Sequence, residues 1–279
     1  MHVLLAYTGN NPGATNNFDL TALTDPDFSQ RNGHYIFTER YRARYLIAQS
    51  AGMTDSRLLT PTFAALNSDG FRIGSFQQAA GVGGVPTLVE NLASPYLQIP
   101  QMEEFQFQGS KTAVGAQQQW GLLSLITDGW TNNLPSGPMI MQEATTASFT
   151  PAANVWSGPQ ALIMNANPRG GVYAVIGAAL QQTADTLAFR MIFPRTSMYN
   201  NRKLRPGWIA QNAIGSFEDV ITQMNRYHLG VWGYFHTFEL PTIEVLATTS
   251  AAMTPILRMW TIYLGGDLNL LNQQLAQMG

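Results

Sequence analysis

The chain contains no cysteine and very few charged residues. The absence of cysteine excludes disulfide bridges, thiolate nucleophiles and cysteine-ligated zinc. Charged residues make up only 11% of the 279 residues, and the formal net charge is −2. Globular proteins usually carry about a quarter of charged residues. The near-neutral balance indicates no specific nucleic-acid surface, because binding to phosphates needs clustered positive charge.

Histidine is also scarce. The four histidines, His2, His34, His228 and His236, form no His-x-His pair. Metal-binding β-barrels need several clustered histidines and a carboxylate, so the sequence predicts no metal site and no cofactor. We expect His236, which follows Phe235 in a strand pattern, to point to solvent or to a neighbouring molecule.

Motifs of the common enzyme classes are missing as well. There is no Gly-x-Ser-x-Gly elbow. Glu103 and Glu104 are adjacent, so in a strand their carboxylates point to opposite faces and cannot act as a glycosidase pair. The glycine run 81–84 lacks the Lys-Ser/Thr of a phosphate-binding loop. We therefore predict no catalytic residues.

Long apolar stretches are absent too. No stretch is long enough to span a membrane as a helix, and the first residues lack the basic flank and apolar segment of a signal peptide. We expect synthesis in the cytosol. The polar residues are mainly Gln, Asn, Thr and Ser, which suits a surface largely buried against neighbours, where unpaired charges are costly.

Short apolar runs alternate with turn-forming residues along the chain, which predicts an all-β fold built of antiparallel sheets. The tryptophans 120, 156, 208, 232 and 260 are mostly flanked by apolar residues, so we expect them in the core. The expected strands begin near residues 2, 34, 44, 105, 120, 161, 171, 186, 231 and 258.

Three helices are also expected. Ser216 can cap a helix after Ile214–Phe217, and Ser75 can do the same in the first half, where the glycine run breaks the helix or delays it to Pro86. Residues 267–279 predict a C-terminal helix with Leu268, Leu271 and Leu275 on one face.

An internal duplication is the strongest signal in the sequence. Residues 56–67 match residues 201–212 without gaps, a second match follows after a loop-sized insertion, and a third aligns Ile99–Pro100 with Leu240–Pro241. Matches in the same order at half the chain length indicate two domains rather than a solenoid. The residue pairs that we expect to superpose are Arg57 and Arg202, Leu59 and Leu204, Pro61 and Pro206, Asn67 and Asn212, Ile73 and Ile214, and Gly74 and Gly215.

This duplication divides the chain into a first domain of residues 1–135 and a second domain of residues 136–279 with the C-terminal helix. Two tandem β-barrels, each with one flanking helix, resemble the double jelly-roll major capsid proteins of tailless icosahedral, membrane-containing viruses. The resemblance covers nearly the whole chain at the level of duplication, strand density and helix placement, and not at the level of a sequence motif. It implies a structural coat protein that forms pseudo-hexagonal homotrimers and then a capsid lattice in the virion.

The resemblance also implies contacts with other capsid proteins and with an internal membrane. Arg40, Arg42 and Arg44 would share one strand face, either solvated or ion-paired, or touching lipid head groups or a neighbouring subunit. Two alternatives stay open for the chain as a whole. One is a glycan- or receptor-binding β-sandwich module of a viral spike or tail, and the other is a bicupin-like enzyme.

Overall fold

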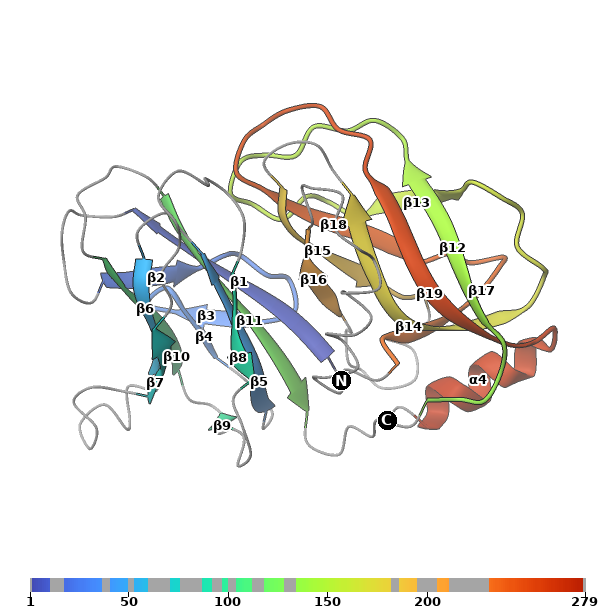
Figure 1. Ribbon diagram of the computed structural model, residues 1–279, viewed down its shortest axis with the longest axis horizontal. Helices are drawn as coiled ribbons and strands as arrows, with labels where there is room; N and C mark the ends of the chain where they lie inside the picture. The colour runs from blue at the N-terminus through green and yellow to red at the C-terminus, as the bar shows by residue number, and fades with distance from the viewer. Residues whose placement is uncertain are drawn as a thin grey trace. The chain divides into compact units, whose positions relative to one another are not determined.

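In the computed structural model the chain forms two compact units, which we describe separately (Figure 1). The N-terminal unit comprises Leu4–Asp128, and the C-terminal unit comprises Gly129–Gly279 together with Met1–Val3. The division into jelly rolls at residues 135 and 136 stays a prediction. The structure describes residues 2–10, 18–36, 41–49, 53–59, 71–75, 87–91, 97–99, 104–111, 118–127, 134–181, 186–194, 205–210 and 231–277.

The described part of the N-terminal unit consists of strands and turns. Its strands are β1 (His2–Asn10), β2 (Phe18–Ala22), β3 (Ser29–Arg31), β4 (His34–Ile36), β5 (Tyr41–Gln49), β6 (Met53–Leu59), β7 (Phe71–Ser75), β8 (Thr87–Asn91), β9 (Leu97–Ile99), β10 (Glu104–Lys111) and β11 (Gln118–Thr127).

The C-terminal unit has eight strands and a final helix in its described residues. They are β12 (Met139–Thr146), β13 (Gln160–Met164), β14 (Val172–Gln181), β15 (Thr186–Ile192), β16 (Gly207–Ile209), β17 (Gly233–His236), β18 (Thr242–Ala247), β19 (Ile256–Gly265) and α4 (Leu268–Gln277).

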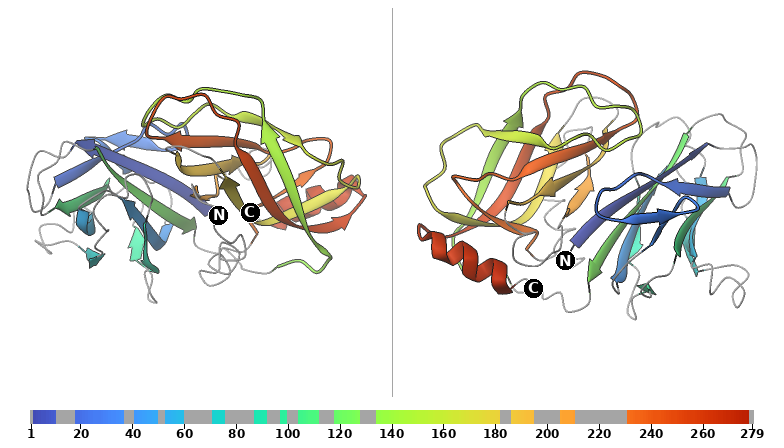
Figure 2. Two further views of the ribbon diagram at one scale, coloured as in Figure 1. Left: turned by 45° about the horizontal axis from the view of Figure 1, so that its top comes forward. Right: turned by 180° about the vertical axis from the view of Figure 1, so that it is seen from behind.

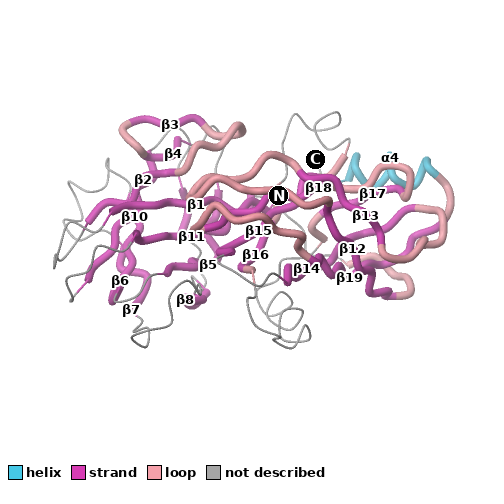
Figure 3. The backbone as a smooth tube through the Cα atoms, turned by 90° about the horizontal axis from the view of Figure 1, so that it is seen from above, coloured by secondary structure: helices cyan, strands magenta, loops and turns pink. Residues whose placement is uncertain are grey.

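Both units have the same strand order. In the N-terminal unit the hydrogen-bonded path runs β7-β6-β10-β2-β1-β11-β5-β8, and in the C-terminal unit it runs β16-β15-β18-β13-β12-β19-β14-β17. Each strand of one path has its counterpart at the same place in the other. Figures 2 and 3 show how the strands of each unit curl. Eight antiparallel strands in this order form a jelly roll, so the chain is all-β with two tandem jelly rolls.

The strand order relates whole strands of the two units and does not test the residue pairs that the sequence suggested. The paths match β6 with β15 and β7 with β16. Arg57 lies in β6 and Gly74 in β7, whereas their proposed partners Arg202 and Gly215 come after β15 and β16 along the chain. Because Arg202, Leu204, Asn212, Ile214 and Gly215 lie outside the described residues, their pairing with the first half stays a prediction.

The N-terminal unit adds a β3–β4 hairpin to this plan. Its turn consists of Asn32 and Gly33, both with positive φ (55° and 79°). Asn-Gly is the favoured pair in such two-residue turns, because both positions need left-handed backbone angles. The hairpin carries Tyr35, which is fully buried and whose hydroxyl lies 2.5 Å from the Leu23 carbonyl oxygen.

Large aromatic side chains fill both cores. In the N-terminal unit the Tyr7 ring packs edge-on against Tyr35, with 5.1 Å between ring centroids, and lies 5.2 Å from Phe107. In the C-terminal unit Phe189 and Trp232 are fully buried and lie 6.2 Å apart. The tryptophans expected in the core are all there, with exposed fractions of 9% or less; they are Trp120, Trp156, Trp208, Trp232 and Trp260.

The C-terminal helix is confirmed, with one change. Asp267 caps α4, since its carboxylate accepts the Asn269 backbone N–H at 2.8 Å. Leu271 and Leu275 are buried, but Leu268 is 40% exposed, because it starts the helix instead of continuing the packed face. No helix among the described residues is long and apolar enough to cross a membrane.

The prediction of a helix that begins at Pro86 is wrong. Thr87–Asn91 form β8, which pairs with β5, because a threonine and a valine at the sheet edge favour the extended chain over a short helix. The expected helix after Ser216 and the residues just after Ser75 lie outside the described residues. The expected strands named above from residues 2, 34, 44, 105, 120, 161, 171, 186, 231 and 258 are confirmed.

Gly233→Ala should lower the stability of the C-terminal unit. A Cβ at Gly233 would lie 2.5 Å from the Phe193 ring, so strand β17 or the ring must move. We expect a loss of about 1–3 kcal/mol in the free energy of unfolding, measured by urea denaturation. Gly158→Ala is the control, since its Cβ meets nothing within 4 Å. Equal stability of the two variants would contradict the packing at Gly233.

Candidate functional site

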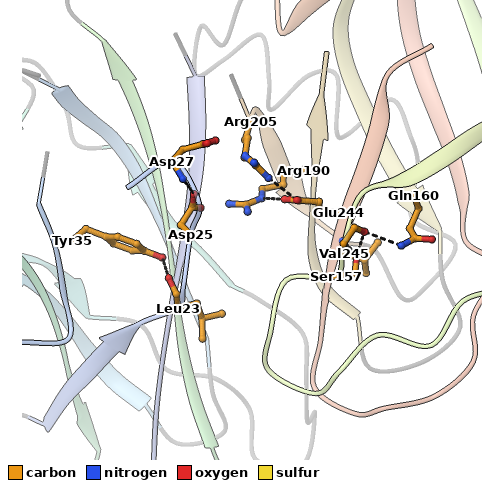
Figure 4. A network of polar contacts seen from close by, with 11 residues as sticks. Leu23, Asp25, Asp27, Tyr35, Ser157, Gln160, Arg190, Arg205, Glu244 and Val245 are labelled. Carbon is orange, nitrogen blue, oxygen red and sulfur yellow. Dashed lines mark hydrogen bonds and ion pairs between the residues drawn. The ribbon is translucent and has the colours of Figure 1, made fainter. Parts of the chain in front are cut away.

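A buried ionic cluster lies on two adjacent strands of the C-terminal unit. Arg190 of β15 and Glu244 of β18 are directly opposite each other in the sheet. Arg190 Nε donates to Glu244 Oε2 and Arg205 Nη1 donates to Glu244 Oε1, both at 2.5 Å (Figure 4). The Arg190 guanidinium also lies over the Trp156 ring, 4.2 Å from its centroid. One carboxylate thus holds two arginines together.

Because this cluster is buried, the fold depends on its ion pairs. The side chains of Arg190, Glu244 and Arg205 are 1%, 6% and 9% exposed. An ion in such a place is tolerated only when its partners and hydrogen bonds are complete. Glu244 pairs with both arginines, and all three residues lie in or next to strands of the sheet, so the cluster is structural: it holds β15, β18 and the start of β16 in one arrangement.

A second polar cluster lies where β12 meets β19. Arg258 Nε donates to Glu143 Oε2 at 2.7 Å, and Asn165 Nδ2 donates to Glu143 Oε1 at 2.7 Å. The guanidinium of Arg258 lowers the pKa of the Glu143 carboxyl. This pair is only partly buried, so salt and solvent weaken it.

An open groove adjoins this second cluster. Its empty volume is about 770 Å³, and its lining is mainly apolar, with Ile140, Met141, Met164 and Tyr173. Gln142 also lines it, and this residue is only 7% exposed. Within the described residues, neither atom of the Gln142 amide has a hydrogen-bond partner. Such a groove can receive side chains of a second molecule, because apolar lining favours burial.

Several large apolar side chains are exposed on the C-terminal unit. Phe238 is 86% exposed at the turn after β17, and Met139 and Met141 are 62% and 56% exposed on β12. Single exposed apolar residues are common, but Met139 and Met141 share one face of β12, and neighbouring exposed apolar side chains are typical of a contact surface. The full set is Leu134, Met139, Ile140, Met141, Val155, Ile163, Phe238 and Leu268.

His236 does not point to solvent, as the sequence suggested. It is 4% exposed, its Nδ1 accepts the Phe238 backbone N–H at 3.2 Å, and its ring stacks on Phe238 at 4.5 Å. His236 therefore shapes the turn after β17. Among the described residues, no three histidine, aspartate or glutamate side chains gather as they would around a metal ion.

The twelve duplicated positions do not form a site in the described part of the chain. Arg57, Leu59, Ile73 and Gly74 lie in β6 and β7, and Pro206 precedes β16, while the other seven lie outside the described residues. Sequence reasoning missed the Arg190–Glu244–Arg205 cluster. The available signal was a charged residue inside each of two apolar strands in a chain with few charges, since such residues are buried only with partners.

The fold and these surfaces define an all-β protein of two tandem jelly rolls with a C-terminal helix. The sequence matches no protein-family model and no curated protein. Among solved structures, the major capsid protein P2 from bacteriophage PM2 is similar at 8% identity with a TM-score of 0.23, over 95% of this chain and 98% of that one. The STIV MCP is similar at 9% identity with a TM-score of 0.24, over 97% and 99%. TM-scores this low establish no common fold, so the assignment rests on the strand order of this chain.

Glu244→Gln should destabilise the protein strongly. The substitution removes the negative charge that Arg190 and Arg205 share and leaves two buried guanidinium groups facing a neutral amide. We expect a loss of about 3–5 kcal/mol in the free energy of unfolding. Glu143→Gln, which breaks the partly exposed pair with Arg258, should cost at most about 1 kcal/mol. Chemical denaturation of both variants checks this, and losses of similar size would contradict a structural role for the buried cluster.

The contribution of Glu143 should disappear in acid. Because Arg258 lowers the pKa of Glu143 in the folded protein, the folded state binds this proton less readily than the unfolded state. The pair therefore stabilises the protein above the unfolded pKa, and its contribution is lost as the pH falls through the folded pKa. The stability difference between the parent chain and Glu143→Gln, measured from neutral to acid pH, should shrink toward zero. A constant difference would show that the charge of Glu143 is irrelevant.

Proposed function

We propose that the chain is a structural coat protein that assembles with copies of itself into the shell of a virus. The observation that carries this proposal is the repetition of one jelly-roll strand order in two successive units. A jelly roll suits shell building, because its packed antiparallel sheets present rigid outer surfaces. Two such units in one chain double the number of barrels that each subunit brings to an assembly.

The trimer is the finer part of the proposal. Three chains with two jelly rolls each would place six similar units around one axis, so a homotrimer can tile a surface like a hexagon. Closed symmetric homo-oligomers are the rule for soluble assemblies. The icosahedral shell, contacts with other capsid proteins and with an internal membrane, location in the virion and synthesis in the host cytoplasm belong to the same proposal.

Composition and surface support assembly. Only 11% of the residues are charged, whereas solubility of a free monomer usually depends on charge. The C-terminal unit also exposes Met139, Met141 and Phe238. In an assembly, uncharged amides can pair across an interface without the cost of removing water from ions, and the apolar side chains become buried. We therefore propose no catalytic role, and no cofactor or metal.

A glycan- or receptor-binding module remains the second candidate. Exposed aromatic rings are the feature that favours it, because sugars stack on them. Among the described residues Phe238 is the large exposed aromatic side chain, while the tryptophans expected in the core are buried. Buried rings cannot serve as stacking platforms, so the described surface favours assembly over sugar binding.

Self-assembly should be visible for the purified full chain. We expect trimers or larger closed particles in analytical ultracentrifugation over a wide concentration range, and regular particles or arrays by electron microscopy. An obligate contact should bury more than roughly 2,000 Å² in total. A strict monomer at all concentrations, with saturable binding to a glycan array, would overturn the coat-protein proposal in favour of the binding module.

A further inference from the structure

Among the described residues, strand β12 has no neighbouring strand on one side over half of its length. On one side, β12 pairs with β19 from Met139 to Thr145. On the other side, β13 pairs only with Ala144–Thr146. Among the described residues, no strand pairs with Met139–Gln142 on that second side. The chain turns away after Asn165, whose backbone N–H donates to the Glu143 carbonyl oxygen at 2.9 Å.

The backbone groups along this edge point outward at two positions. The Tyr263 N–H donates to the Pro138 carbonyl oxygen at 3.2 Å, and Thr261 Oγ1 donates to the Ile140 carbonyl oxygen at 2.9 Å. Pro138 and Ile140 thus direct their carbonyls toward β19. Because backbone groups alternate along a strand, Met139 and Met141 direct their N–H and C=O groups toward the open side. The Glu143 carbonyl, which faces Asn165, follows the same alternation.

Nothing in the side chains protects this edge. Exposed strand edges usually carry a charged residue, a proline or a bulge, which prevent other strands from adding. Met139, Ile140, Met141 and Gln142 contain no charge and no proline, and the first three are 62%, 39% and 56% exposed. The next charged residue along the strand, Glu143, is paired with Arg258, and Arg169, which lines the groove beside the edge, lies over the Tyr263 ring. The edge is therefore open to strand addition and apolar.

We propose that β12 of a second copy of this chain pairs with this edge in antiparallel direction, around a twofold axis at Ile140. The hydrogen-bonding pattern is self-complementary: Met139 of one copy faces Met141 of the other, and each such pair exchanges two backbone hydrogen bonds. An isologous contact of this kind uses the same surface on both copies. It joins the strands β12, β19, β14 and β17 of two chains into one continuous sheet. The proposal rests on the self-assembly proposed above and assigns one contact to it.

The groove beside the edge leaves room for the added strand. It opens along Ile140–Glu143 and is bounded by the segment Met164–Arg169. Side chains that an incoming strand directs to this face, such as the Ile140 of the second copy, can enter it. On the other face, Met139 and Met141 of both copies come together and lose their exposure to water.

A single engineered cysteine tests the twofold axis directly. Ile140 would face Ile140 of the second copy in a non-hydrogen-bonded pair, where the Cα atoms lie about 4.5 Å apart, within the range that a disulfide spans. Since the chain contains no cysteine, Ile140→Cys introduces the only thiol. Under mild oxidation we expect most of this variant to run as a disulfide-linked dimer on a non-reducing gel. Val155→Cys, at a 49% exposed residue away from the edge, should stay unlinked.

A second variant separates this contact from assembly as such. Met141→Lys places a charge on the exposed edge without altering the core, and should weaken association roughly tenfold or more, while Val155→Lys should not. Circular dichroism confirms that each variant is folded. If the chain assembles but Ile140→Cys does not cross-link and Met141→Lys assembles normally, the β12 contact is refuted and self-assembly stands. A parent chain that stays a strict monomer would refute both the β12 contact and the proposed self-assembly.

Discussion

The short pairing of β12 with β13 is the contact on which the C-terminal unit depends. Only Ala144–Thr146 pair with Leu162–Met164, yet this pairing joins the strands from β13 to β16 with those from β12 to β17. A long pairing would keep all eight strands in one twisted sheet, whereas a short one lets the two sets diverge and enclose a core. The N-terminal unit has the same device, where β1 meets β2 at Tyr7 and Thr8.

The short pairing of β12 with β13 also affects the surface of the C-terminal unit. Where β13 leaves β12, the backbone of Met139 and Met141 is left with unpaired donors and acceptors among the described residues. Backbone N–H and C=O groups without a strand partner can bind water. Next to exposed methionines they also favour the addition of another strand. The short β12–β13 pairing therefore has two results. It lets the two sets of strands enclose the core, and it leaves part of β12 available to a second copy of the chain.

Charge is used sparingly and in few places. In the C-terminal unit, Glu244 holds two buried arginines and Glu143 holds Arg258 at the surface. The buried cluster specifies how β15 and β18 align, because a shifted register would leave an ion without its partner. Only 11% of all residues are charged, which suits the assembly proposed above, because uncharged side chains lose less free energy than ions on leaving water.

The sequence by itself determined the class of secondary structure, the position of most long strands and the C-terminal helix. Alternating apolar residues and turn signals are local, so Gly171–Leu180 or Arg258–Leu264 could be recognised as strands without any partner. The tryptophans could be placed in the core for the same reason. The short strands β3 and β8 show no regular alternation of apolar and polar residues. They exist because neighbouring strands supply their hydrogen bonds.

Only the tertiary structure decided which strands are neighbours. The strand order matches β6 with β15, and no short similarity in the sequence specified this match, since pairing depends on hydrogen bonds between distant segments. The same holds for the joining of Arg190, Arg205 and Glu244, for the burial of His236 and for the open edge at Met139–Gln142. Each depends on how distant strands pack together, so none could be read from the local sequence.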